Sequence, residues 1–159
     1  MSTDTGIRGG SAVAGLLLVL ALLMTGLVTD HARAAEEVTP RDKMLALTNQ
    51  DRTERDKKAL KLNAALSRYA ARHSEDMAEA GLVHTPIKAL IKKVEALGID
   101  WSAIGENIGV GPSLRSVQKA FMGSTDHRKN ILNAAYDHVA TGVFEADDGS
   151  DWVTVIFYG

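Results

Sequence analysis

The hydrophobic periodicity of the sequence changes after Leu132, and this change constrains the fold more than any other feature. Before it, apolar residues recur at helical spacing in several segments. After it the side chains alternate, so that Val139 and Val143 fall on one face of an extended segment and Phe144 on the other. Residues 147–150, Asp-Asp-Gly-Ser, are a hairpin-turn signal, and residues 152–158 are rich in β-branched and aromatic side chains. We therefore predict an α+β fold in which helices precede an antiparallel hairpin.

Residues that favour helix ends predict four helices in the first part of the chain. Their expected starts are Pro40, Asn63, Thr85-Pro86 and Ser113, because Asn, Thr and Ser are common N-caps and proline suits the first helical position. A fifth, short helical turn follows the small residues at 123–125, with Asp126 as its expected cap and His127 as its first residue.

Glycines are expected to end two of these helices. Gly81 follows the helix that ends at Ala80 and Gly98 follows the next helix, so both residues should have positive φ. We also expect Leu82 to contact Met77, as the apolar pair of a Schellman motif does.

The first 34 residues have the pattern of a secretory signal peptide. Arg8 precedes an uncharged apolar run over residues 12–28, and Ala32-Arg33-Ala34 offers a small-residue cleavage site. The alternative is a transmembrane anchor, because the run approaches the roughly 18–20 residues that span a bilayer. The small-residue cleavage site favours a signal peptide that is removed over an anchor that is retained. We expect a signal peptide at 1–34, a linker at 35–39 and one domain at 40–159, secreted or held in the cell envelope, with membrane contact only through the signal segment.

Composition excludes several classes of protein. The chain has no cysteine, so an exported domain of this kind depends on packing rather than disulfides, and a lipid anchor on cysteine is excluded. A formal net charge of −2 does not fit a strongly basic nucleic-acid binder.

Three polar side chains lie where the chain breaks its regular pattern. His127 starts the short helical turn, Glu106 lies in a glycine-punctuated apolar segment, and His84 follows a helix stop. A buried carboxylate needs partners, so Glu106 either accepts backbone N–H groups or holds a histidine in one tautomer. His73 falls on the apolar stripe of a helix, and we interpret it as a hydrogen-bonded core histidine rather than a ligand.

Taken in order, these segments resemble the CAP superfamily, which comprises cysteine-rich secretory proteins, insect venom antigens and plant pathogenesis-related proteins. The chain is most similar to the cysteine-free bacterial branch, the SCP domain. The matching pieces follow the family order, and they are Asn49-x-x-Arg52, His73-Ser74-x-x-Met77-Ala78, His84, Gly105-Glu106-Asn107-Ile108, Phe121-Met122-x-Ser124-x-x-His127-Arg128-x-Asn130-Ile131-Leu132, Gly142-Val143 and Trp152 to Tyr158.

The resemblance implies a three-layer α-β-α sandwich with a small antiparallel sheet between helices. It also implies a shallow cleft lined by two histidines and two acids. His84, Glu106 and His127 match three of these positions, whereas Ser124 stands where the second acid is missing. Phe121 stands where most members have tryptophan.

Three functions are open for this cleft, because one scaffold of this kind serves many roles. The first is an extracellular binding module in which His84, Glu106 and His127 take zinc or another divalent metal, or in which the cleft takes a small apolar ligand. The second is a hydrolase acting on peptide or cell-wall material, with a histidine as general base oriented by Glu106. Ser124 could be its nucleophile, but no Gly-x-Ser-x-Gly elbow surrounds it. The third is a purely structural hydrogen-bond network.

We rank binding first, structure second and catalysis third, and assign no catalytic residue. Hydrolysis needs an activated nucleophile or a well-held metal together with oxyanion donors, and only fragments of such a site are visible. A small ligand or a cell-envelope component is the expected partner.

Overall fold

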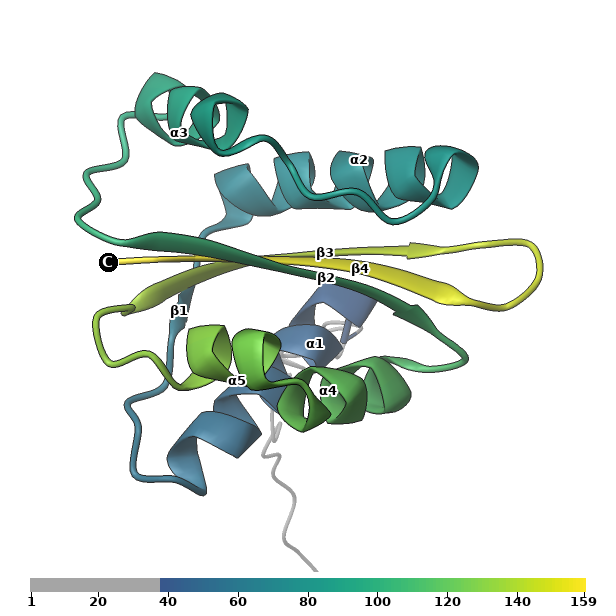
Figure 1. Cartoon of the computed structure of the whole chain (residues 1–159), viewed down its shortest axis with the longest axis horizontal. Coiled ribbons are helices and arrows are strands. Elements are labelled where there is room, and N and C mark those ends of the chain that lie inside the picture. Colours follow the sequence, from purple (N-terminus) through teal and green to yellow (C-terminus); the bar gives the residue numbers. More distant parts are fainter. Residues whose placement is uncertain (1–37) are drawn as a thin grey trace, which may run out of the picture. The chain divides into compact units, whose positions relative to one another are not determined.

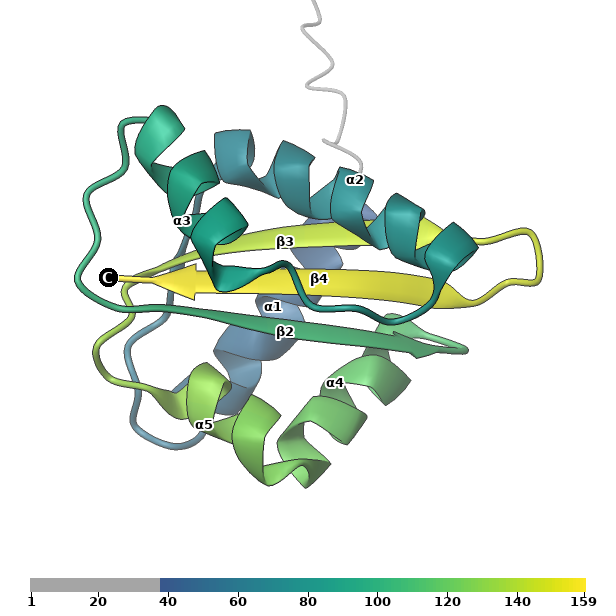
Figure 2. The same cartoon turned by 45° about the horizontal axis from the view of Figure 1, so that its top comes forward.

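The computed structural model describes residues 38–159, which form a four-stranded sheet between two layers of helices (Figure 1). In chain order the elements are α1 (Pro40–Thr53), β1 (Lys61–Leu62), α2 (Ala64–Ala80), α3 (Ile87–Ala96), β2 (Ile104–Gly111), α4 (Leu114–Gly123), α5 (Thr125–Leu132), β3 (His138–Glu145) and β4 (Asp151–Tyr158). Helices α2 and α3 cover one face of the sheet, and α1, α4 and α5 cover the other (Figures 1 and 2). The predicted α+β class and the implied α-β-α sandwich are confirmed, but the sheet is mixed and not purely antiparallel, because the short strand β1 pairs parallel with β3.

The expected signal peptide, residues 1–34, lies outside the described residues. None of the helices within residues 38–159 is long and apolar enough to cross a membrane.

The strand order β1-β3-β4-β2 makes β2 an edge strand. β3 and β4 form the predicted antiparallel hairpin, and β2 pairs antiparallel with the other side of β4. In this register Glu106 lies opposite Ile156, and Asn107 lies opposite Val155. Residues opposite each other on neighbouring strands point to the same face of the sheet, so Glu106 and Asn107 point to opposite faces.

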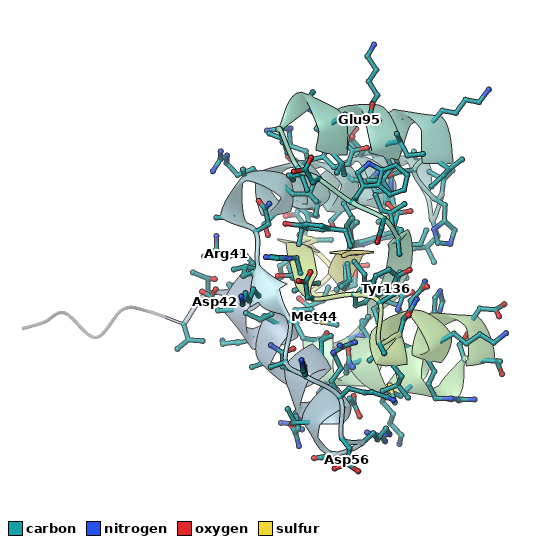
Figure 3. The ribbon with its side chains drawn as sticks, turned by 90° about the vertical axis from the view of Figure 1, so that its left-hand side faces the viewer. Arg41, Asp42, Met44, Asp56, Glu95 and Tyr136 are labelled. Carbon is teal, nitrogen blue, oxygen red and sulfur yellow. The ribbon has the colours of Figure 1, made fainter. Side chains whose placement is uncertain are left out.

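Two apolar clusters join the sheet to its helices. The cluster on the α2 and α3 side comprises Leu66, Ala70, Leu90, Val94, Ala140, Ile156 and Tyr158. The cluster on the other side includes Met44, Phe121, Ile131, Tyr136, Val153, Val155 and Phe157. Met44 and Tyr136 lie inside the fold, whereas Asp56 and Glu95 lie at its outer ends (Figure 3). Since Ile156 belongs to the first cluster and Val155 to the second, Glu106 faces α2 and Asn107 faces α4 and α5.

Local capping explains where several helices begin. The Asn63 side chain accepts the Leu66 backbone N–H at the start of α2, and the Ser113 side chain accepts the Ser116 N–H at the start of α4, as predicted. Pro40 is the first residue of α1, preceded by Thr39 in a capping box. Each cap satisfies a backbone donor that the helix itself leaves unpaired.

Two predicted caps are wrong. Helix α3 begins at Ile87, one residue later than predicted, so its N-cap is Pro86, whose side chain has no hydrogen-bond acceptor, and Thr85 lies one residue too early to cap the helix. Helix α5 begins at Thr125 rather than His127, and its N-cap is Ser124, again without a side-chain bond from residues 38–159. Ser124 is both the C-cap of α4 and the N-cap of α5, so Asp126 lies inside the first turn of α5 and cannot cap it.

The glycine stops are confirmed in part. Gly81 and Gly98 have φ of +91° and +66°. However, ψ of Gly81 is 168°, which takes the chain into an extended path instead of the left-handed turn of a Schellman motif. Leu82 is consequently 52% exposed while Met77 is buried, and their expected apolar contact is wrong.

Candidate functional site

Glu106 is the centre of a polar cluster at the edge strand β2. Its side chain is only 5% exposed. Glu106 Oε2 lies 2.9 Å from His84 Nδ1 and also accepts the Thr85 backbone N–H at 2.9 Å. The carboxylate oxygen is the acceptor, so His84 Nδ1 is assigned as the donor and Nε2 is the nitrogen that can accept or ligate. The structure therefore brings two of the three candidate residues together, and the two roles given as alternatives for Glu106 occur side by side, since Oε2 contacts both the histidine and a backbone N–H.

His73 joins this cluster, although the sequence placed it in the core. Its Nε2 lies 3.8 Å from Glu106 Oε1, too far for a hydrogen bond. Both atoms are buried, and neither has a hydrogen-bond partner among the described residues. The prediction of a hydrogen-bonded core histidine is thus wrong for Nε2 in this structure, although α2 directs the ring toward the Glu106 carboxylate.

His127 approaches β2 from the opposite side of the sheet, on α5. Its ring packs edge-on against Phe121, with 4.9 Å between ring centroids. Burial lowers the pKa of His127, the nearby charge of His84 lowers it further, and Asp126 partly offsets both. A lowered pKa keeps this imidazole neutral over more of the physiological pH range, which is the form that ligates metals or accepts protons.

The two histidines therefore flank the free edge of β2, one from the segment between α2 and α3 and one from α5 (Figures 1 and 2). Within residues 38–159 no hydrogen bond or ion pair joins His127 to Glu106, and no three acidic or histidine side chains are grouped closely enough to hold a metal ion. The site thus consists of two imidazoles, those of His84 and His127, and of the Glu106 carboxylate, which of these two contacts His84 only.

Two asparagines that the sequence analysis left without a role fix α5 against β2. Asn107 Nδ2 donates to the His127 carbonyl at 3.0 Å. Asn130 Nδ2 donates to the Asn107 side-chain oxygen at 2.8 Å and to the Glu106 carbonyl at 3.2 Å. Both residues belong to the matched motifs next to Glu106 and His127, and this adjacency is the signal that could have identified them.

Ser124 has no arrangement suited to a nucleophile. Its backbone N–H donates to the carbonyls at the end of α4, and within the described part of the chain its hydroxyl makes no hydrogen bond to either histidine. A serine nucleophile needs a base within hydrogen-bond reach. The geometry gives no support to a Ser124 triad.

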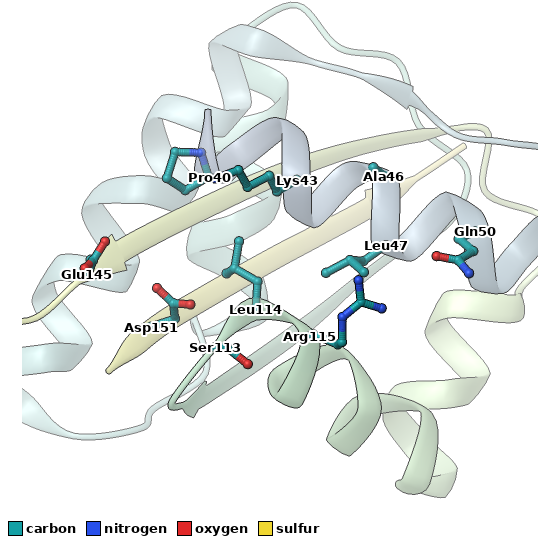
Figure 4. Close-up of a pocket in the computed structure, with 10 residues that line it drawn as sticks. All are labelled: Pro40, Lys43, Ala46, Leu47, Gln50, Ser113, Leu114, Arg115, Glu145 and Asp151. Carbon is teal, nitrogen blue, oxygen red and sulfur yellow. The ribbon is translucent and has the colours of Figure 1, made fainter. Parts of the chain in front are cut away.

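A hollow of about 540 Å³ lies elsewhere on the described surface, between α1 and α4, and shares no residue with the histidine cluster (Figure 4). Its lining mixes charges of both signs, with Lys43 and Arg115 alongside Glu145 and Asp151. These opposite charges favour no single charge on a ligand. We place the candidate site at the histidines because chemistry, rather than volume, distinguishes it.

Comparison with known proteins gives a consistent family and fold. The model of the cysteine-rich secretory protein family, CAP, matches residues 45–157. The chain is 34% identical over 114 residues to the uncharacterized protein YkwD of Bacillus subtilis, a match that covers 69% of this chain and 44% of YkwD. It is 29% identical over 123 residues to the uncharacterized membrane protein YlbC of the same organism, covering 73% of this chain and 35% of YlbC. The chain thus spans less than half the length of these curated relatives.

Two solved structures have the same fold. An extracellular protein of Bacillus anthracis that contains an SCP domain superposes with a TM-score of 0.65 at 21% identity, over 75% of this chain and 40% of that one. An outer surface protein of Borrelia burgdorferi superposes with a TM-score of 0.64 at 15% identity, over 73% of this chain and 89% of that one.

Proposed function

The chain belongs to the CAP family of cysteine-rich secretory proteins, and from this premise we propose that it is an extracellular binding module whose cleft takes a divalent metal, zinc. The single observation that supports this most is the 2.9 Å contact between His84 Nδ1 and Glu106 Oε2. Histidines that ligate metals usually donate their other ring N–H to a carboxylate or a carbonyl, which fixes the tautomer and orients the ring. His84 and Glu106 have this arrangement.

In this proposal the ligands are His84 Nε2 and the imidazole of His127, and Glu106 orients His84. Glu106 Oε2 already accepts two hydrogen bonds and Oε1 faces His73, so neither oxygen is directed toward His127. The lowered pKa of His127 supplies a neutral second imidazole. Zinc held by two side chains keeps coordination positions open, which a ligand oxygen or water fills.

Apolar side chains beside His84 suit a ligand with an apolar part. Leu82 and Val83 are 52% and 56% exposed, and Ile87 is 55% exposed. These three large apolar side chains are exposed within six residues of chain, on the segment that carries His84. A ligand with an oxygen donor for the metal and an apolar portion for these side chains fits both features.

Zinc titration of the protein by calorimetry near neutral pH tests the proposal. The wild type should bind zinc, and His84→Ala and His127→Ala should each abolish binding. Glu106→Gln should weaken it by roughly 10- to 100-fold, as loss of an outer-shell partner does. Affinity should fall as the pH is lowered and the imidazoles take up protons, because protonated imidazole does not ligate.

His138→Ala is the matched control. His138 also contacts a carboxylate, since its Nδ1 lies 2.6 Å from Asp137 Oδ1, but it is on β3 outside the cleft. Zinc uptake should be unchanged in this variant. No uptake by the wild type, or uptake indifferent to both cleft substitutions, would contradict the proposal and favour a structural role for the network.

A further inference from the structure

Two buried polar atoms in the cluster face each other without a bond. His73 Nε2 and Glu106 Oε1 are 3.8 Å apart, and the side chains are 13% and 5% exposed. Neither atom has a hydrogen-bond partner in the part of the chain that the structure describes. An unsatisfied buried polar group costs about 1–3 kcal/mol, so such pairs need an explanation.

Neighbouring contacts hold both groups where they are. The His73 ring stacks on Tyr69, one turn earlier on α2, with centroids 6.4 Å apart and planes inclined by 8°. The Tyr69 hydroxyl lies 3.4 Å from Thr85 Oγ1, and the Thr85 N–H donates to Glu106 Oε2. His73, through Tyr69, and Glu106 are therefore both connected to Thr85. These shared contacts argue against a chance approach of His73 Nε2 and Glu106 Oε1.

We propose that His73 is a positioning residue of the cleft, whose Nε2–H donates to Glu106 Oε1 and fixes the carboxylate so that Oε2 meets His84 Nδ1. The separation has to shorten by about 1 Å, which a small rotation of the glutamate side chain provides. Nε2 is a donor in one neutral tautomer and in the charged ring, so the bond does not depend on a particular protonation state.

This assignment gives α2 a role in the cleft. Glu106 then accepts from His73 on Oε1 and from His84 and Thr85 on Oε2, so the carboxylate has one orientation. His84 is held as the Nδ1–H tautomer, with its Nε2 lone pair available. Without the His73 donor the carboxylate can rotate, and His84 exchanges between tautomers.

Nitrogen-15 NMR of the histidine side chains tests this without any metal. In the wild type, the imidazole spectrum of His84 should show the Nδ1–H form. His73→Leu, which keeps apolar bulk but removes the donor, should give a mixture of His84 tautomers. His73→Gln, whose amide can donate, should restore the wild-type spectrum, and His138→Gln should leave the His84 signals unchanged.

Zinc affinity is a second measurement, and it rests on the proposed function. His73→Leu should weaken binding roughly 3- to 10-fold, less than direct loss of an outer-shell partner, and His73→Gln should recover it. A protein that binds no zinc but shows the tautomer change would contradict the proposed function and leave the role of His73 intact.

Two outcomes would overturn the role of His73. One is an unchanged His84 spectrum in His73→Leu. The other is a His73→Gln variant that behaves like His73→Leu, because the effect would then come from packing. If His73→Leu does not fold, His73→Gln alone decides: a folded variant with mixed His84 tautomers contradicts the proposal.

Discussion

At the scale of single residues, His127 links the cleft to pH-dependent stability. Burial and the nearby charge of His84 lower the pKa of His127 in the folded protein. The unfolded chain keeps the ordinary histidine pKa of about 6.5 and so binds a proton first as the pH falls. The unfolded state is thereby favoured, and the free energy of unfolding drops from about pH 6.5 down to the pKa of the folded state, below which the loss is constant.

We expect His127→Gln to reduce this loss. Denaturant unfolding of the wild type and the variant at about pH 7.5 and about pH 5 isolates the contribution of His127 to the pH dependence of the unfolding free energy, because the other titrating groups are common to both proteins. The wild type should lose more stability than the variant on acidification. Equal losses would show that the folded protein does not disfavour protonation of His127.

How far the residues of the site could be predicted depends on how local their contacts are. The motif residues Glu106 and His84 were identified from the sequence, and the structure brings them together. The position of His73 was not predictable, because a residue on an apolar helical stripe faces whatever the helix packs on, and here that is a carboxylate on β2.

Arg52 is a further residue that sequence patterns could not place. It lies in the middle of a polar stretch, residues 48–58, yet it is 1% exposed. Its guanidinium donates to the backbone carbonyls of Lys58, Ile131, Asn133 and Tyr136. A buried arginine of this kind needs carbonyl groups from distant segments as hydrogen-bond partners. Only the tertiary structure brings those segments together, so local sequence patterns do not reveal them.

At the scale of elements, α2 lies directly on β3 at Gly142. A Cβ at this glycine would lie 2.1–2.4 Å from backbone atoms of Ala70 and Ala71. Real Cβ atoms do not approach backbone this closely, so any side chain here separates the helix from the sheet.

Gly142→Ala should therefore be strongly destabilising, by roughly 2–3 kcal/mol or more. Gly123→Ala is the matched control, because Gly123 is the last residue of α4 and a Cβ there would meet no atom of the described chain within 4 Å. The control should be neutral or slightly stabilising, since alanine favours the helix. Denaturant midpoints measure both, and comparable midpoints for the two variants would contradict the close α2–β3 contact.

Element ends show what local sequence can decide. The caps at Asn63 and Ser113 were predicted, because each side chain reaches a backbone N–H three residues ahead. Thr85 and Asp126 were equally good cap candidates by residue type. Thr85 fails because α3 begins one residue later than predicted, with Pro86 at its N-cap, and Asp126 fails because α5 begins before it, at Thr125.

At the scale of the whole molecule, local patterns predicted the β3–β4 hairpin but not the sheet around it. The pairing of β2 with β4 and of β1 with β3 joins segments far apart in sequence. The hydrophobic periodicity of a segment indicates that it is a strand, but not which strand it pairs with. The sandwich came from the family resemblance. The position of Glu106 at the free edge of the sheet follows from the pairing of β2 with β4 alone.

Export is a prediction for the part of the chain outside the described residues. The apolar run and the Ala32-Arg33-Ala34 site predict that residues 1–34 are removed, which leaves a domain free of the membrane. Mass spectrometry of protein collected outside the cell should find Ala35 as the first residue. Retention of Met1, or recovery of all the protein with membranes, would favour an anchor.

The metal content of the untagged protein, purified without chelators, tests the central claim most directly. Elemental analysis should find about one zinc ion per chain in the wild type and essentially none when His84 and His127 are both replaced by alanine. Circular dichroism should show that the double variant keeps the fold, so that a loss of metal reports on the ligands and not on unfolding. Wild-type protein without any transition metal, or equal metal content in both proteins, would contradict a metal-binding cleft.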